Sequence, residues 1–290
     1  MTDQYPVVTW ITDHGNWPSF SSDGTQVVYT QIGPNIGYRI AIVAATGGTP
    51  TVLDTGLHAS SRPDWSWNPD TIAFTGQAVE GGSNRLWLID SDGSNCRSVG
   101  MYAIEGNVLY PSWYQDQTTL VVANYFQLEE QVQVRLLKVQ MGSTGTTVSP
   151  LTSISNITAG RPSVNPSGTA VAFAGNDGPY DQQNNQIWSV VPPSDPTQVY
   201  ANQGRSPNWS PDGQWIVFES NYGSPSPADY AIFVIASDGS GAVGQLSAYD
   251  YSGPHPEWSR DQTKIVFGGA PRNGIGVIDT PAAYLPTGSN

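Results

Sequence analysis

The chain has 290 residues, enough for one large domain or two of medium size, and its formal net charge is −13. Nucleic acid and anionic membranes attract basic surfaces, so this charge argues against either as a partner. The content of 31 Gly and 23 Pro indicates many turns between short strands, and the single cysteine, Cys96, excludes an intrachain disulfide and a cysteine-based zinc cluster.

The first predicted element is a strand over Val7–Ile11. The residues around it have neither the basic region nor the long apolar region of a signal peptide, and the longest apolar runs are too short to span a bilayer. We therefore expect a soluble chain without membrane insertion. A signal peptide removed earlier would leave the same sequence, so we favour a periplasmic or extracellular location and leave the compartment open.

From residue 17 onwards one phrase repeats six times. In its clearest copy, at 206–220, a Pro is followed two residues later by an aromatic residue, then by an Asp-Gly turn and a β-branched run. The six copies open at Pro18, Pro63, Pro111, Pro162, Pro207 and Pro256, at spacings of 45 to 51 residues. Self-similarity at this period predicts a propeller-type array in a single domain.

The register inside each copy is constant. Two residues after the Pro stand Phe20, Trp65, Trp113, Val164, Trp209 and Trp258. Nine residues after the Pro, the first strand-forming positions are Val27, Ile72, Leu120, Val171, Ile216 and Ile265. A turn-forming pair lies between the two marks in each copy, which indicates a strand, a tight turn and a second strand. We expect the aromatic residue to fill the space between adjacent sheets.

A third strand follows in each copy, at Tyr38–Val43, Arg85–Ile89, Val132–Val139, Gln186–Val191, Tyr230–Ile235 and Gly274–Ile278. Most copies add a fourth, as at Thr51–Leu53 and Val243–Leu246. The chain is therefore predicted to be an all-β, six-bladed β-propeller with four antiparallel strands per blade and blades starting near residues 17, 62, 110, 161, 206 and 255. The segment after Asp279 is a poor strand, so the N-terminal strand at 7–11 is expected to complete the last blade and close the ring.

The phrase Pro207-Asn208-Trp209-Ser210-Pro211-Asp212-Gly213, followed by Ile216-Val217-Phe218, resembles the WD40-like (PD40) repeat of the TolB family. Ser237-Asp238-Gly239-Ser240 and Asp90-Ser91-Asp92-Gly93 resemble the third hairpin of that repeat. The resemblance covers nearly the whole chain and is weakest in blade four, where Val164 replaces the aromatic residue. The α/β domain that precedes the propeller in TolB has no counterpart in these residues, so the resemblance implies the fold and no particular partner.

One face of such a propeller carries the inter-blade connections and the second hairpin loops. In this chain those loops vary in length, from 33–37 to 175–185, whereas the opposite face has short Asp-Gly-type turns. We call the first face the loop face. Variation on one face is expected of a binding surface built from loops, and equally of neutral drift in solvated loops.

The residues just before each Pro are expected around the mouth of the central channel on the loop face. They are Trp17, Arg62, Tyr110, Arg161, Ser206 with Arg205 beside it, and His255. Three arginines in this ring could hold a carboxylate, a phosphate or an acidic side chain. Alternatively, each arginine pairs with a neighbouring carboxylate such as Asp13, Asp64, Glu105 or Glu257.

We predict a non-catalytic binding or scaffolding propeller that docks a protein segment or a glycan on the loop face. The candidate ligand-binding residues are Arg62, Tyr110, Arg161, Arg205, His255, Trp17, Tyr180 and Tyr222, with no catalytic residue and no resident cofactor. The aromatic residues among them suit either a sugar or a protein segment.

Two alternatives remain open. One is a metal-dependent lyase or hydrolase that uses His14, His58 or His255 with a divalent ion. The other is a structural subunit of a larger assembly. The run at 90–95, Asp-Ser-Asp-Gly-Ser-Asn, could offer oxygens to calcium, but a plain hairpin turn is the preferred interpretation.

Overall fold

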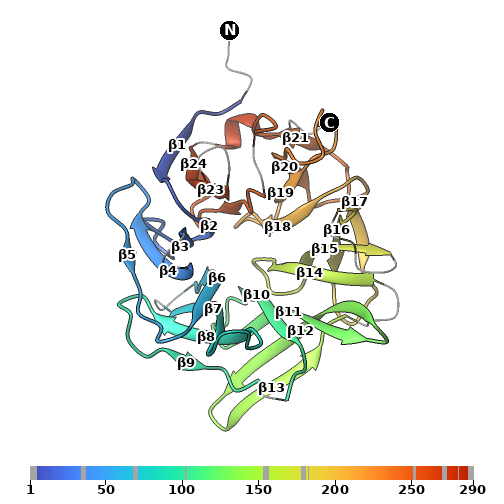
Figure 1. The fold of residues 1–290 in the computed structure, drawn as a ribbon. Coiled ribbons are helices and arrows are strands. Elements are labelled where there is room, and N and C mark those ends of the chain that lie inside the picture. The colour runs from blue at the N-terminus through green and yellow to red at the C-terminus, as the bar shows by residue number, and fades with distance from the viewer. Residues whose placement is uncertain are drawn as a thin grey trace.

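The computed structural model is a ring of six four-stranded antiparallel sheets around a central channel (Figure 1). The structure describes residues 5–33, 37–67, 71–101, 103–152, 157–177, 181, 183–250, 253–269, 273–279 and 281–286. The predicted six-bladed propeller is confirmed. None of the described residues forms a helix of the length and apolar character that a membrane span requires.

Each of the first three blades is a meander of four consecutive strands. Blade 1 contains β2 (Asn16–Phe20), β3 (Gln26–Gly33), β4 (Gly37–Ala44) and β5 (Thr51–Val52). Blade 2 contains β6 (Ala59–Trp65), β7 (Thr71–Gln77), β8 (Arg85–Asp90) and β9 (Arg97–Ser98). Blade 3 contains β10 (Asn107–Trp113), β11 (Thr119–Leu128), β12 (Gln131–Gly142) and β13 (Gly145–Pro150).

The next two blades repeat this order. Blade 4 contains β14 (Ile157–Val164), β15 (Val171–Asp177), β16 (Gln186–Val190) and β17 (Thr197–Tyr200). Blade 5 contains β18 (Arg205–Trp209), β19 (Trp215–Ser220), β20 (Ala231–Ala236) and β21 (Val243–Gln245).

Blade 6 takes its fourth strand from the other end of the chain. It contains β22 (Glu257–Trp258), β23 (Lys264–Gly269), β24 (Gly274–Asp279) and β1 (Val8–Thr12). In β1, Val8 lies opposite Ile278 and Trp10 opposite Gly276, and Figure 1 shows β1 beside β24. The predicted ring closure is confirmed, with the strand one residue later than expected. A short 3₁₀ helix, η1 (Pro281–Tyr284), follows β24.

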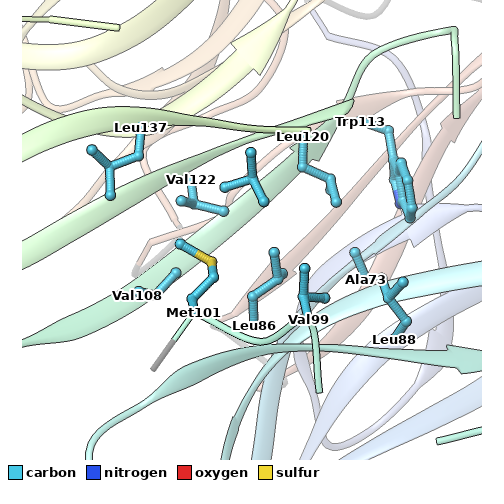
Figure 2. Close-up of a cluster of buried hydrophobic side chains, with 11 residues drawn as sticks. Ala73, Leu86, Leu88, Val99, Met101, Val108, Trp113, Leu120, Val122 and Leu137 are labelled. Carbon is cyan, nitrogen blue, oxygen red and sulfur yellow. The ribbon is translucent and has the colours of Figure 1, made fainter. Parts of the chain in front are cut away.

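The hydrophobic core consists of six clusters, one between each pair of neighbouring blades. Every cluster contains one residue from the position two after the repeat Pro and one from the position nine after it. Figure 2 shows the cluster in which Trp113 and Leu120 of blade 3 face Leu86 and Leu88 of blade 2. The repeated aromatic residue therefore fills the space between sheets, as the sequence predicts.

A closed ring of hydrogen bonds joins the innermost strands. In each blade, the side chain of the residue that directly follows the repeat Pro accepts a hydrogen bond. The donor is a backbone N–H of the next blade, from the residue two positions after the repeat Pro of that blade. The six acceptors are Ser19, Asp64, Ser112, Ser163, Asn208 and Glu257. Their partners are the N–H groups of Trp65, Trp113, Val164, Trp209, Trp258 and Phe20, at 2.8 to 3.2 Å. The last bond links blade 6 to blade 1, so the ring has no open end.

Candidate functional site: the channel mouth

A repeated backbone irregularity aims six side chains into the channel mouth. The residue before each repeat Pro has a positive φ, between 44° and 54°, although none of the six is glycine. In blades 1 to 5 the pairing register also shifts at this point. The following Pro disfavours helical conformations for these residues, and a left-handed non-glycine residue costs roughly 1–3 kcal/mol. The rest of the blade holds this strained geometry in place.

The mouth is a hollow of about 100 Å³. The side chains before the six prolines line it: Trp17, Arg62, Tyr110, Arg161, Ser206 and His255. A larger hollow, lined in part by loop residues Asn184 and Asn221, shares Arg161 and His255 with the mouth, so the mouth opens on the loop face. These residues lie where the sequence places them; their binding role stays a prediction.

A buried carboxylate organises one side of the mouth. Glu219, at the end of β19, is fully buried and pairs with Arg161 at 2.9 Å and with Arg205 at 3.3 Å. Burial alone would raise the pKa of Glu219, but Arg205, His255 and Arg161 outweigh it and lower the pKa to about 2. Arg205 also stacks on Tyr230, with its guanidinium carbon 3.9 Å from the ring centre. The alternative in which an arginine of the ring pairs with a carboxylate therefore holds for Arg161 and Arg205, although the carboxylate is Glu219 and not one of the four named from the sequence.

Ser206 lies at the centre of this cluster. Its Oγ is 2.6 Å from Glu219 Oε1, 2.7 Å from His255 Nδ1 and 3.0 Å from Arg161 Nη1. Burial lowers the pKa of His255 to about 3, so the imidazole is neutral, and its Nδ1–H can donate to Ser206 while the hydroxyl donates to Glu219. A catalytic triad places the imidazole between hydroxyl and carboxylate, whereas here the hydroxyl contacts both. The arrangement fixes Arg161 through Ser206 and Glu219 and differs from the order of a catalytic triad.

Arg62 occupies the opposite side of the mouth. Its guanidinium carbon lies 4.5 Å from the Trp17 ring centre and 4.8 Å from that of Tyr110. Its Nη1 donates to Ser61 Oγ at 3.0 Å, and its buried Nε has no partner among the described residues. Within the described part of the chain, Arg62 has no ion pair, unlike Arg161. Of the arginines, Arg62 and Arg161 line the mouth, whereas Arg205 lines the adjoining hollow.

Tyr110 connects the two sides. Arg161 lies with its guanidinium carbon 5.5 Å from the Tyr110 ring centre, on the same ring that Arg62 contacts. Burial alone would raise the pKa of Tyr110, but the two arginines outweigh it and lower the pKa to about 8. A phenol in this position is neutral at pH 7 and negatively charged in mildly alkaline solution.

Two members of the hydrogen-bonded ring are buried acids deeper in the channel. Burial raises the pKa of Asp64 to about 6, although Arg260 opposes the change. Burial and the nearby Asp64 raise the pKa of Glu257 to about 8. Arg260 lies over the Trp67 ring at 3.7 Å and donates to the Trp65 carbonyl at 3.0 Å. At pH 7 Glu257 is therefore mostly protonated, whereas Asp64 is mostly ionised and its charge is offset by Arg260.

Several predicted residues lie away from the mouth. Tyr222 is 55% exposed on the loop after β19 and does not line the hollow, and Tyr180 lies outside the described residues. His14 and His58 are exposed, and the described ranges contain no group of three His, Cys, Asp or Glu side chains able to bind a metal. In the turn between β8 and β9, Asp90 accepts a hydrogen bond from Asn95, as in a plain hairpin turn.

Sequence reasoning missed Glu219 and the hydrogen-bonded ring. Twelve residues after the repeat Pro, the other copies have Thr30, Thr75, Ala123, Ala174 and Gly268, so a Glu at this inward position is exceptional. The ring also has a signal, because the residue after each repeat Pro is polar in all six copies. Both signals appear when the copies are aligned column by column.

No protein-family model and no curated protein sequence matches the chain. Solved structures match it in fold. TolB from Acinetobacter baumannii is 16% identical and has a TM-score of 0.65, over 88% of this chain and 64% of that chain. The chain has the TolB-type six-bladed β-propeller fold. The resemblance of its repeats to those of TolB is therefore confirmed, and the chain spans less than two thirds of that TolB's length.

Other similar structures are enzymes by name. An oligogalacturonate lyase in complex with manganese is 13% identical, with a TM-score of 0.64 over 97% of this chain and 95% of that chain. A gluconolactonase from Xanthomonas campestris is also 13% identical, with a TM-score of 0.67 over 94% of this chain and 89% of that chain. At such identities the likeness shows a shared fold, and function has to be argued from the mouth itself.

Proposed function

We propose that the protein is a non-catalytic binding propeller whose channel mouth holds an anionic group of a protein segment or glycan docked on the loop face. The observation that carries the proposal is Arg62, a half-buried arginine between two aromatic rings, whose buried Nε has no hydrogen-bond partner and which has no ion pair among the described residues. A buried charge is stabilised by a partner of opposite sign, and a carboxylate or phosphate suits the planar guanidinium.

The surroundings of Arg62 support an anion over a cation. Arg161 and Arg205 share Glu219, and Arg260 offsets Asp64, so positive charge is in excess around Arg62 in a chain whose overall charge is −13. Trp17 adds a second buried donor, because its indole N–H has no hydrogen-bond partner in the described part of the chain. Two unpartnered donors and a positive field in one small hollow favour an oxygen-bearing anion.

Isothermal titration calorimetry with D-glucuronate, a Gly-Glu dipeptide and inorganic phosphate tests this proposal. We expect binding to the wild-type protein and at least a tenfold loss in Arg62→Gln. Arg97→Gln is the matched control, since Arg97 is a half-exposed arginine of the β8–β9 hairpin and pairs with Asp90. The Arg97→Gln variant should bind the ligands with the same affinity as the wild type. Equal affinities for Arg62→Gln and the wild type would reject the mouth as the binding site. Tighter binding of phosphate than of both carboxylates would identify the anion as a phosphate group.

A metal-dependent lyase or hydrolase is the second candidate, and the likeness to a manganese-containing lyase favours it. His255 is the histidine at the mouth, and its neutral imidazole could be a metal ligand. Thermal unfolding with and without Mn²⁺ tests this candidate. A stabilisation that a chelator reverses and that His255→Ala abolishes would support it over the non-catalytic proposal.

A further inference from the structure

A second hollow beside the mouth has the character of a ligand groove. Its volume is about 800 Å³, and it lies between the loop-face ends of blades 4, 5 and 6. It shares Arg161 and His255 with the mouth, so the two hollows are adjacent. Volumes of 300–1,000 Å³ are usual for sites that hold small molecules. We refer to this hollow as the side groove.

The side groove contains two buried N–H donors that lack a hydrogen-bond partner among the described residues, Gln203 Nε2 and Arg205 Nε. Both side chains are held in place by other contacts. Gln203 Oε1 accepts a hydrogen bond from the Asn221 backbone N–H at 3.0 Å, and Arg205 is fixed by Glu219 and by the Tyr230 ring. An oriented, desolvated donor without an acceptor costs about 1–3 kcal/mol, which a ligand oxygen would recover.

The lining of the side groove distinguishes a sugar from a peptide. Four amide side chains line it beside two arginines, and Pro227, Ala228 and Tyr230 form its apolar part; the amides are Gln183, Asn184, Gln203 and Asn221. Its described lining has no Leu, Ile, Val, Met or Phe, whereas peptide-binding grooves use apolar pockets or an open sheet edge for their affinity. Sugar hydroxyls donate and accept at the same atom, so amide and guanidinium groups can match them without an apolar pocket.

We infer that the mouth and the side groove are two subsites for one acidic oligosaccharide, with a terminal carboxylate at Arg62 and neutral sugar rings against Gln203 and Arg205. This inference rests on the proposed function, because it places the same anionic group at Arg62. It adds the ligand class and a second set of contacts.

Calorimetry with D-glucuronate and with a trisaccharide of two neutral sugars and one terminal glucuronate tests the inference. We expect the trisaccharide to bind at least tenfold more tightly than the monosaccharide. Gln203→Met removes the free donor while keeping the side-chain length, so it should lower trisaccharide affinity about tenfold and leave D-glucuronate affinity unchanged. Gln133→Met changes a half-buried amide of blade 3 and should alter neither affinity. Melting temperatures of both variants verify that they fold.

The outcomes separate this inference from the proposed function. Equal affinities for the monosaccharide and the trisaccharide would overturn the role of the side groove as a sugar subsite. If D-glucuronate binding is still lost in Arg62→Gln, the proposed binding role of the mouth stands. Absence of D-glucuronate, dipeptide and phosphate binding to the wild-type protein would overturn both. A Gly-Gly-Glu tripeptide could instead bind more tightly than the trisaccharide and lose affinity in Gln203→Met. That result would assign the side groove to a protein segment and overturn the inference that its ligand is an oligosaccharide.

Discussion

Tyr110 makes the charge of the mouth depend on pH. It faces Arg62 of β6, Arg161 of β14 and the ring of Tyr125 on β11, whose centre is 6.4 Å away. Its lowered pKa of about 8 means that raising the pH above this value creates a phenolate, which offsets one guanidinium.

We expect the affinity for D-glucuronate to fall roughly tenfold as pH rises from 7 to 9.5, because the phenolate competes with the ligand for the same positive charge. In Tyr110→Phe the affinity should stay constant over this range. Calorimetry at constant ionic strength measures both profiles. A fall of the same size in Tyr110→Phe would show that another group causes it.

Glu219 is the carboxylate on which the arginine side of the mouth depends. Glu219→Gln leaves Arg161 and Arg205 buried without a countercharge, so we expect the free energy of unfolding at pH 7 to drop by roughly 3–5 kcal/mol. Urea denaturation measures this change. Glu129→Gln is the control, because Glu129 is exposed between β11 and β12 and its replacement should change stability little.

The same substitution has a pH signature. The pKa of Glu219 is about 2 in the folded protein, below its ordinary value of 4.5, so its stabilising contribution is complete above about pH 4.5. It is lost as the pH falls from 4.5 towards 2, where the unfolded chain takes up a proton first. The stability difference between the wild type and Glu219→Gln should therefore shrink in this range. A difference that is constant from pH 7 to pH 2.5 would contradict the ion-pair assignment.

At the scale of the strand, the innermost strands combine a strained residue with a hydrogen bond to the next blade. Ser163 of β14 is buried and accepts a hydrogen bond from the Trp209 N–H of β18 at 3.2 Å. Ser163→Ala leaves that N–H unpaired between the blades, and we expect a loss of about 1–3 kcal/mol in the free energy of unfolding. Ser194→Ala, at an exposed turn of the same blade, should change stability by less than about 0.5 kcal/mol. Equal losses in chemical denaturation would mean that the ring bond contributes nothing.

The strands themselves are predictable because their signals are local. The Pro, the aromatic residue and the Asp-Gly turn occupy fixed offsets within a few residues, and these offsets determine where β18 ends and β19 begins. The contacts of Ser163 and Glu219 are different, since each joins residues at least 46 positions apart, to Trp209 and Arg161 respectively. Their partners depend on how blades stack, which no single repeat encodes. Trp209 also remains half-buried, although its repeat position matches that of the fully buried Trp65.

At the scale of the whole molecule, the repeat predicts more than the fold. Equivalent positions of a closed ring project to equivalent places, so the residues before the six prolines meet at the mouth even though 238 positions separate Trp17 from His255 (255 − 17). The symmetry of the repeat predicts where these six residues lie, whereas the chemistry of the mouth depends on which side chain stands at this position in each copy. The overall charge of −13 gives no hint of the local excess of positive charge, because that excess comes from Arg62, which has no ion pair among the described residues, beside Arg161 and Arg205, which share Glu219.

The ring depends on β1 for its closure. Ile11 belongs to the buried cluster between blades 6 and 1, and Trp10 packs edge-on against Phe267 of β23 at 5.7 Å. Removal of residues 1–13 opens the edge of β24 and exposes part of this cluster. We expect the free energy of unfolding to fall by roughly 5 kcal/mol, since several apolar side chains and a row of strand hydrogen bonds are lost together.

A synthetic peptide of residues 5–14 added to the truncated protein should restore stability. The peptide binds the folded state and not the unfolded chain, so the melting temperature should rise with peptide concentration. A peptide with Ile11→Asp should not restore it, because the charge would enter the apolar space between blades 6 and 1. If the truncated chain unfolds at the same denaturant concentration as the full chain, β1 is an accessory strand and the propeller is closed by the contacts between its inner strands alone.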